Sequence, residues 1–219
     1  MSFLLNEFHA FYHDFRLAPA GILGHFSAMR SHTLACILLI ALLIPFRVLS
    51  AMGMLPNFSP LPALVICSLI FLRGKQAWFV PLIAWVITDP LVSLIQGYPI
   101  VGPHHVGIIL GMLGPIALAL LLRHQQKPLV VLGSSLAGAV MFYFCSNMVS
   151  FLFDPLYPKT AEGFLQAQWT GPAGLGPTWV FLRNLAAANL IFTALFLLAR
   201  RSLPCPAPES GTLAAYGRR

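Results

Sequence analysis

Six long apolar runs dominate this chain and constrain its fold more than any other feature. The runs together hold only three charged residues, Arg47, Asp89 and Arg183. A helix needs about 20 apolar residues to cross the hydrocarbon core of a bilayer. Charged residues make up 9% of the chain, against roughly 25% in a soluble domain. We therefore predict an all-α, polytopic membrane protein with about six transmembrane helices, at Thr33–Ala51, Pro60–Leu72, Ala77–Ile95, Val106–Leu122, Pro128–Phe153 and Val180–Ala199.

Several function classes have no motif in this sequence. The four cysteines form no CxxC pair, which argues against a zinc or disulfide framework. Because a phosphate-binding Gly-rich loop, an HExxH motif and a Ser/His/Asp set are all lacking, the chain is not predicted to be an enzyme, and its sequence identifies no cofactor. The net charge of +7 does not predict nucleic-acid binding, because the basic residues lie at the ends of the apolar runs, where they set orientation.

The basic residues predict how the helices are oriented. Connections rich in Lys and Arg remain in the cytoplasm, and three positions carry such pairs: Arg73 with Lys75, Arg123 with Lys127, and Arg200 with Arg201. With six crossings, both termini are then cytoplasmic. We predict a protein of the bacterial cytoplasmic (inner) membrane that contacts membrane lipid.

The chain divides into three predicted segments. Residues 1–32 place apolar side chains at helical spacing, which is typical of an amphipathic helix in the membrane interface; the alternative is a cleavable signal peptide. These side chains are Leu4, Phe8, Phe11 and Phe15. Residues 33–199 form the six-helix transmembrane domain. Residues 202–219 are rich in proline and predict a disordered tail.

Polar side chains near the membrane gather in the half that this orientation places outward. They include Arg47, Asn57, Asp89, Asn147, Arg183 and Asn184. Because a charge at bilayer depth costs roughly 2.5–3.5 kcal/mol, we expect Asp89 to pair with Arg47 or Arg183. Such a pair either locks helix packing or borders an outward-facing cavity that binds something small. The gathering on one side favours the cavity.

Two other features of the outer side lead to weaker predictions. The connection over 154–178 is rich in Pro and Gly, and it is either a lid or a plain surface loop. His104 and His105 are adjacent, and adjacent side chains point in different directions on a regular element. We therefore predict no metal site.

The run Pro56-Asn57-Phe58-Ser59-Pro60 resembles the Pro-Asn-Phe-(Thr/Ser)-Pro motif of a bacterial membrane protein family of unknown function. That family is similar to the substrate-binding S components of energy-coupling factor (ECF) transporters. The chain departs from the family at Ala188-Asn189, where a Gly-Asp pair is expected. The likeness covers roughly residues 35–198 and continues through Val80-Pro81-Leu82, Thr88-Asp89, Asn147, Tyr157-Pro158-Lys159-Thr160 and Phe181-Leu182-Arg183-Asn184.

The resemblance implies an S-component-like bundle with an outward-facing pocket for a vitamin or a metal ion. It also implies a transmembrane partner subunit, for which the small residues Ser27, Ser31 and Ala35 offer a weak docking pattern. The alternative function is an accessory or structural subunit of a larger membrane complex, with Trp78 and Trp85 contacting lipid or pigment. Our leading prediction is a small-molecule binding or uptake subunit whose ligand residues are Arg47, Asn57, Asp89, Asn147, Lys159, Arg183 and Asn184.

Overall fold

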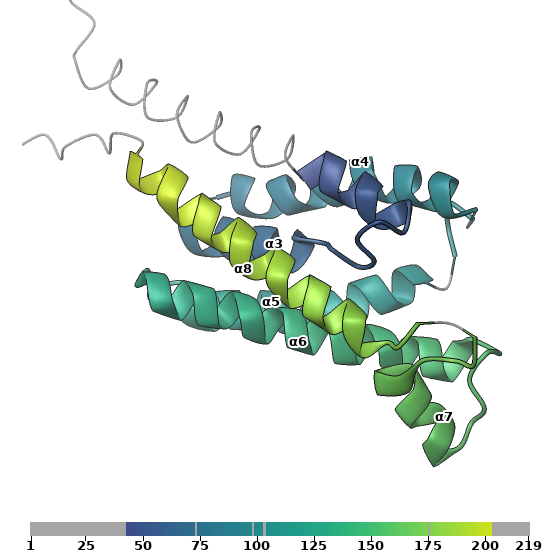
Figure 1. The fold of residues 1–219 in the computed structure, drawn as a ribbon. Helices are drawn as coiled ribbons and strands as arrows, with labels where there is room; N and C mark the ends of the chain where they lie inside the picture. Colours follow the sequence, from purple (N-terminus) through teal and green to yellow (C-terminus); the bar gives the residue numbers. More distant parts are fainter. Residues whose placement is uncertain (1–42, 73, 98, 103, 175, 203–219) are drawn as a thin grey trace, which may run out of the picture. The chain divides into compact units, whose positions relative to one another are not determined.

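The computed structural model describes residues 43–202 apart from 73, 98, 103 and 175. The chain divides into two units, Leu38–Arg200 and Met1–Ile37 with Arg201–Arg219, and nearly all described residues belong to the first. Every regular element in the described residues is helical, which confirms the all-α prediction for them. After the helical residues 43–51, the order is α3 (Leu61–Phe71), α4 (Gln76–Gln96), α5 (His104–Leu122), α6 (Pro128–Phe153), α7 (Ala161–Leu165), the π-helical turn η1 (Gln166–Thr170) and α8 (Trp179–Ser202) (Figure 1).

Some sequence-based predictions fall on residues outside this description. They are the interfacial helix over 1–32, the docking pattern at Ser27, Ser31 and Ala35, and the tail beyond Ser202. Ser202 itself is the last residue of α8.

Four helices, α4, α5, α6 and α8, are long and apolar enough to cross a membrane. They match the crossings predicted at 77–95, 106–122, 128–153 and 180–199, and they identify the chain as a membrane protein. Large apolar side chains stay exposed on their outer faces; Leu121 and Leu129, for example, are 77% and 83% exposed, as lipid contact requires. The predicted total of six crossings is not confirmed. In the described part of the chain, the first run contributes only residues 43–51, and α3 is short.

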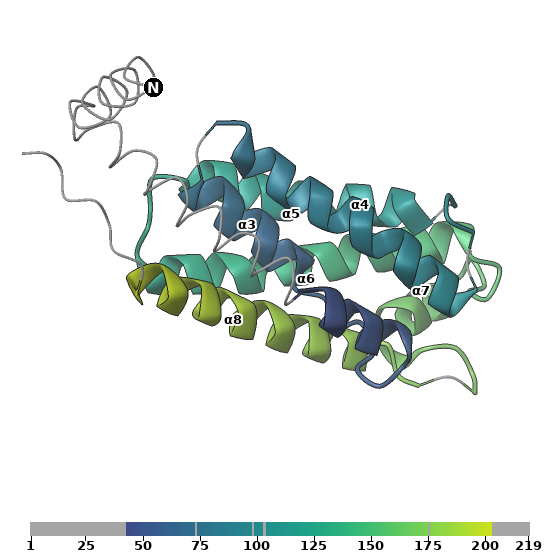
Figure 2. The same cartoon turned by 90° about the horizontal axis from the view of Figure 1, so that it is seen from above.

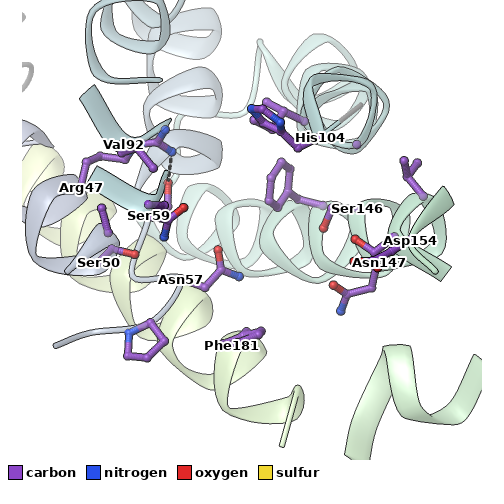
Figure 3. Close-up of a pocket in the computed structure, with 18 of the residues that line it drawn as sticks. Arg47, Ser50, Asn57, Ser59, Val92, His104, Ser146, Asn147, Asp154 and Phe181 are labelled. Carbon is purple, nitrogen blue, oxygen red and sulfur yellow. Dashed lines mark hydrogen bonds between the residues drawn. The ribbon is translucent and has the colours of Figure 1, made fainter. Parts of the chain in front are cut away.

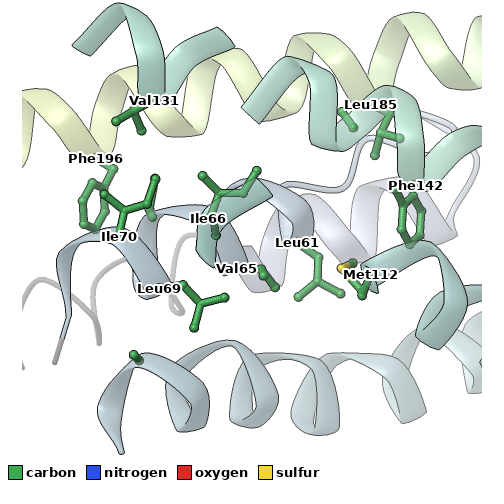
Figure 4. Close-up of a cluster of buried hydrophobic side chains, with 14 of the residues drawn as sticks. Leu61, Val65, Ile66, Leu69, Ile70, Met112, Val131, Phe142, Leu185 and Phe196 are labelled. Atoms are coloured by element: carbon green, nitrogen blue, oxygen red, sulfur yellow. The ribbon is translucent and has the colours of Figure 1, made fainter. Parts of the chain in front are cut away.

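α3 is a central, buried helix. Its 11 residues include ten that are buried, and it packs against α4, α5 and α6. Figure 4 shows Ile66 of α3 in one apolar cluster with Met112, Val131 and Phe196 from three other helices. A helix that is apolar on every side is stable when it is covered on every side. α3 is only about 16 Å long, which is too short to cross a bilayer by itself. Because its neighbours cover it, it forms the core of the bundle.

A buried asparagine ties α8 to the first turn of α3. Asn189 Oδ1 accepts a hydrogen bond from the backbone N–H of Ala63 at 2.6 Å, an amide that the start of a helix leaves unpaired. Its Nδ2 donates to the carbonyl oxygens of Ser59 at 3.1 Å and Leu185 at 2.7 Å. A carboxylate cannot donate. The amide at position 189, where the resemblance leads one to expect Asp, therefore suits a residue that holds two helices together.

The connections between helices form two chemically different ends of the bundle, whose long helices run along a common direction (Figure 2). The basic end comprises the α3–α4 and α5–α6 connections and the last turn of α8, where Arg200 donates to Gln126 Oε1 at 2.9 Å. The polar end comprises the connection into α3, the α4–α5 connection and the α6–α8 connection. Side chains from all three of these connections line one cavity.

Candidate functional site

A tight turn carries the Pro-Asn-Phe-Ser-Pro run into α3. Asn57 has φ +57°, in the left-handed region that Asn tolerates better than most residues. The backbone N–H of Phe58 donates to the carbonyl oxygen of Leu55 at 3.0 Å. The backbone N–H of Ser59 donates to the backbone carbonyl oxygen of Asn57 at 2.9 Å. Pro60 then precedes α3, where its missing N–H would have no helical partner. The motif therefore determines where α3 begins.

Arg47 and Asp89 form a buried ion pair between residues 43–51 and α4. Arg47 Nη2 lies 3.3 Å from Asp89 Oδ1, and the two side chains are 12% and 8% exposed. Arg47 Nη1 also donates to Ser59 Oγ at 3.2 Å. On the other side, His105 Nε2 lies 2.8 Å from Asp89 Oδ2. The expected pairing of Asp89 with either Arg47 or Arg183 is thus confirmed, with Arg47 as the partner.

A cavity of about 670 Å³ lies at the polar end beside this ion pair. Of the predicted ligand residues, Arg47, Asn57 and Asn147 line it (Figure 3), whereas Asp89 pairs with Arg47 and is not part of the lining. The lining is a mixture of apolar walls and polar groups. The residues predicted to bind a ligand did not include its other polar members, which are Ser50, Ser59, Gln96, His104, Ser146, Ser150 and Asp154.

One signal for the missed residues was present in α6. Ser146, Asn147 and Ser150 fall within about one turn of that helix, and residues four apart lie on the same face. The three side chains all line the cavity. Polar residues so close together on an apolar helix therefore indicated a shared polar face, even before the partners of α6 were known.

Lys159 lies outside the cavity lining. Its ammonium group donates to the backbone carbonyl oxygens of Phe151, of Asp154 at 3.0 Å and of Tyr157 at 3.1 Å. It therefore caps carbonyl groups at the C-terminal end of α6, and its predicted contact with a ligand is not supported. Nearby, burial and the Asp154 carboxylate raise the pKa of Tyr157, so this phenol is neutral at physiological pH.

Arg183 and Asn184 also lie outside the lining. The Arg183 guanidinium donates to Asn184 Oδ1, from Nη2 at 3.1 Å, and lies over the ring of Trp179 at 5.6 Å. Asn184 Nδ2 donates to the carbonyl oxygen of Pro56 at 2.9 Å. Asn184 therefore holds the start of α8 against the turn before α3, whereas Arg183 is exposed and its described contacts are with Asn184 and Trp179 of α8. The predicted contact of these two residues with a ligand stays a prediction.

The connection over 154–178 is folded and anchored to α6. α7 begins after Thr160, whose Oγ1 accepts a hydrogen bond from the backbone N–H of Gly163 at 3.2 Å. The Tyr143 hydroxyl donates to the carbonyl oxygen of Gln168, and Gln168 Nε2 donates back to that of Phe144 at 3.4 Å. The connection is therefore an ordered segment with its own helical turns. The prediction that it acts as a lid stays a prediction.

Asp89, His104 and His105 come together at the edge of the cavity. Each offers one atom that can bind a metal, and these atoms lie within 4.8 Å of one another. The two imidazole rings have centroids 4.1 Å apart, so the expectation that adjacent histidines point apart is wrong here. The reason is local: α5 begins at His104, and His105 Nδ1 lies 3.1 Å from the carbonyl oxygen of Gly102, which turns its ring back.

Comparison with known proteins gives one informative match and two negative results. The model of a family of unknown function (DUF6580) matches residues 27–205. This range includes α3 to α8, the cavity and the Asp89–His104–His105 cluster. Comparisons with curated proteins and with solved structures gave no significant match.

Proposed function

The chain belongs to the DUF6580 family, whose function is unknown, and we propose that it binds a small molecule in the polar-end cavity as the binding subunit of an uptake system. The cavity carries this proposal. It has a volume of about 670 Å³ and walls from several separate helical segments. Small-molecule sites occupy roughly 300–1,000 Å³ and combine apolar walls with a few polar groups.

The lining favours a ligand that has both apolar surface and hydrogen-bond acceptors. Phe142 and Phe181 supply apolar walls, while the guanidinium of Arg47 supplies donors. The Nδ2 group of Asn147 is buried and has no hydrogen-bond partner in the described structure. An unsatisfied buried donor costs roughly 1–3 kcal/mol. A ligand oxygen that reaches this amide recovers part of that cost.

Uptake requires that the cavity face the outside of the cell. Its lining lies at the polar end, away from Lys75, Arg123, Lys127 and Arg200. By the positive-inside rule, the basic end is cytoplasmic, so the cavity faces outward. The resemblance to ECF S components supports the same orientation and an uptake role.

A cavity-filling substitution tests the proposal. Ser146 lines the cavity, whereas Met148 on the same helix is 40% exposed and serves as a matched control. We expect mass spectrometry of compounds released from purified protein to identify one that accompanies the native chain and Met148→Phe. Ser146→Phe should retain at least tenfold less of it, because the phenyl ring occupies its space.

Two results would contradict this proposal. One is equal retention of the compound by Ser146→Phe. The other is the absence of any such compound from all three proteins after extraction in native lipid. Recovery of the chain only within a stoichiometric larger assembly, without a compound, would instead favour the accessory or structural subunit.

A further inference from the structure

We propose that Asp89, His104 and His105 bind one divalent transition-metal ion at the edge of the cavity. They offer a carboxylate oxygen and two imidazole nitrogens within 4.8 Å of one another. Imidazole ligands suit Zn²⁺, Co²⁺ and Ni²⁺, whereas Mg²⁺ and Ca²⁺ prefer oxygen ligands. Three protein ligands leave a further coordination position open. His104 also lines the cavity, so the open position lies on the cavity side.

Two of the ligand atoms already lie close to the spacing that one ion requires. His105 Nε2 and Asp89 Oδ2 are 2.8 Å apart. Metal–ligand bonds of about 2.0–2.2 Å place neighbouring ligands about 3 Å apart at octahedral angles and about 3.4 Å apart at tetrahedral angles, so binding of an ion moves these two atoms slightly apart. His104 is the first residue of α5, and its ring lies 4.1 Å from that of His105, centroid to centroid. A rotation of the His104 side chain that brings one of its ring nitrogens closer to the other two ligand atoms would complete the site.

Outer hydrogen bonds orient two of these ligands. Arg47 Nη2 donates to Asp89 Oδ1 at 3.3 Å, which leaves Oδ2 for the ion. His105 Nδ1 lies 3.1 Å from the carbonyl oxygen of Gly102, and metal-binding histidines are usually held by such a bond from their other nitrogen. Arg47 also offsets the charge of Asp89. The lower net charge of the site weakens the binding of ions that are held by charge alone more than the binding of ions that bond to imidazole.

The 2.8 Å contact needs a positive centre between its two atoms. When His105 Nδ1–H donates to Gly102, Nε2 of the neutral ring carries a lone pair, which faces the lone pairs of Asp89. A metal ion removes this repulsion. The competing occupant is a proton on Nε2, which is also compatible with Nδ1 accepting a bond from the Gly102 N–H at 3.1 Å. The experiment must therefore separate metal from proton.

The test is a Co²⁺ titration of the full-length protein in detergent, purified with a histidine-free tag and stripped of metal by a chelator. The visible absorption of Co²⁺ reports nitrogen and oxygen ligation. We expect one Co²⁺ per chain, displaced by Zn²⁺ and retained in excess Mg²⁺. His104→Gln and His105→Gln should each weaken binding at least tenfold. His124→Gln is the matched control, because His124 is exposed and lies in the α5–α6 connection.

Three results overturn the metal site. The first is equal binding by all variants, and the second is no binding by the native chain. The third is loss of binding instead on His9→Gln or His13→Gln, which replace two other histidines of the sequence. Each result leaves a proton at the Asp89 contact. Circular dichroism of the metal-free variants checks folding. If His105→Gln does not fold, His104→Gln decides. The outcome is separate from that of the proposed function, since Co²⁺ binding is measured without any organic compound, and Ser146→Phe leaves all three ligands in place.

Discussion

Arg47 and Asp89 show how much depends on single residues in this protein. They are 42 positions apart in the sequence, yet their side chains are only 12% and 8% exposed and lie against each other, while Asp89 also contacts His105. A buried charge without a partner costs several kcal/mol, whereas replacing both members of a pair by apolar side chains is often neutral. The pair therefore matters mainly because the Arg47 guanidinium has the Asp89 carboxylate as its charge partner.

A double-mutant cycle tests this dependence. We expect Asp89→Leu to lower the free energy of unfolding in micelles by about 3–5 kcal/mol, because Arg47 loses its carboxylate. The double variant Arg47→Met/Asp89→Leu should recover most of that loss. Denaturant titrations of metal-free native, single and double variants measure the coupling. Additive effects of the two substitutions would show that the pair does not stabilise the fold in this way.

At the scale of secondary-structure elements, the fold depends on close packing of α6 against its neighbours. Gly138 of α6 is buried, and a Cβ atom there would lie 2.8 Å from Cδ1 of Ile66 on α3 and 3.5 Å from Cα of Pro115 on α5. Small residues let membrane helices approach closely. This one glycine therefore allows three helices to meet at one point.

Two glycines of α6 form a matched pair for testing this packing. Gly138→Leu should lower the free energy of unfolding by about 1–3 kcal/mol through overpacking. Gly133→Leu should be nearly neutral, because a Cβ at Gly133 meets nothing within 4 Å. Thermal unfolding of the two variants in the same detergent compares them directly. Equal midpoints would contradict a close contact at Gly138.

At the scale of the whole molecule, the two ends of the bundle predict its orientation. The basic end carries the Lys and Arg pairs, while the cavity lies at the polar end. Gln125 and Gly176 are exposed positions at the basic and polar ends, respectively. A Cβ at Gly176 also meets no atom within 4 Å, so a side chain fits there without strain.

Cysteine labelling measures this orientation. In a chain without its native cysteines, we expect an impermeant maleimide to label Gly176→Cys in intact spheroplasts. Gln125→Cys should react only after the membrane is permeabilised, because basic connections remain in the cytoplasm. Labelling of Gln125→Cys alone in intact spheroplasts would show the opposite orientation, in which the cavity faces the cytoplasm.

Much of the architecture was predictable because hydropathy and helix length are local properties. The runs at 77–95, 106–122, 128–153 and 180–199 became α4, α5, α6 and α8 with boundaries shifted by three residues or fewer. The run at 60–72 is shorter than the roughly 20 residues that a crossing needs, and it is the buried helix α3. Its central position was not predictable, because a uniformly apolar helix shows no preferred face.

The sequence by itself determined the membrane environment, the four long apolar helices and the few charges that lie within the apolar runs. Scarcity of charge and run length are sufficient for those conclusions. Only the tertiary structure decided that Asp89 pairs with Arg47, that His104 and His105 join it, and that Lys159 and Arg183 lie outside the cavity. These outcomes depend on distances between groups on different helices, and such distances follow from packing rather than from composition or spacing.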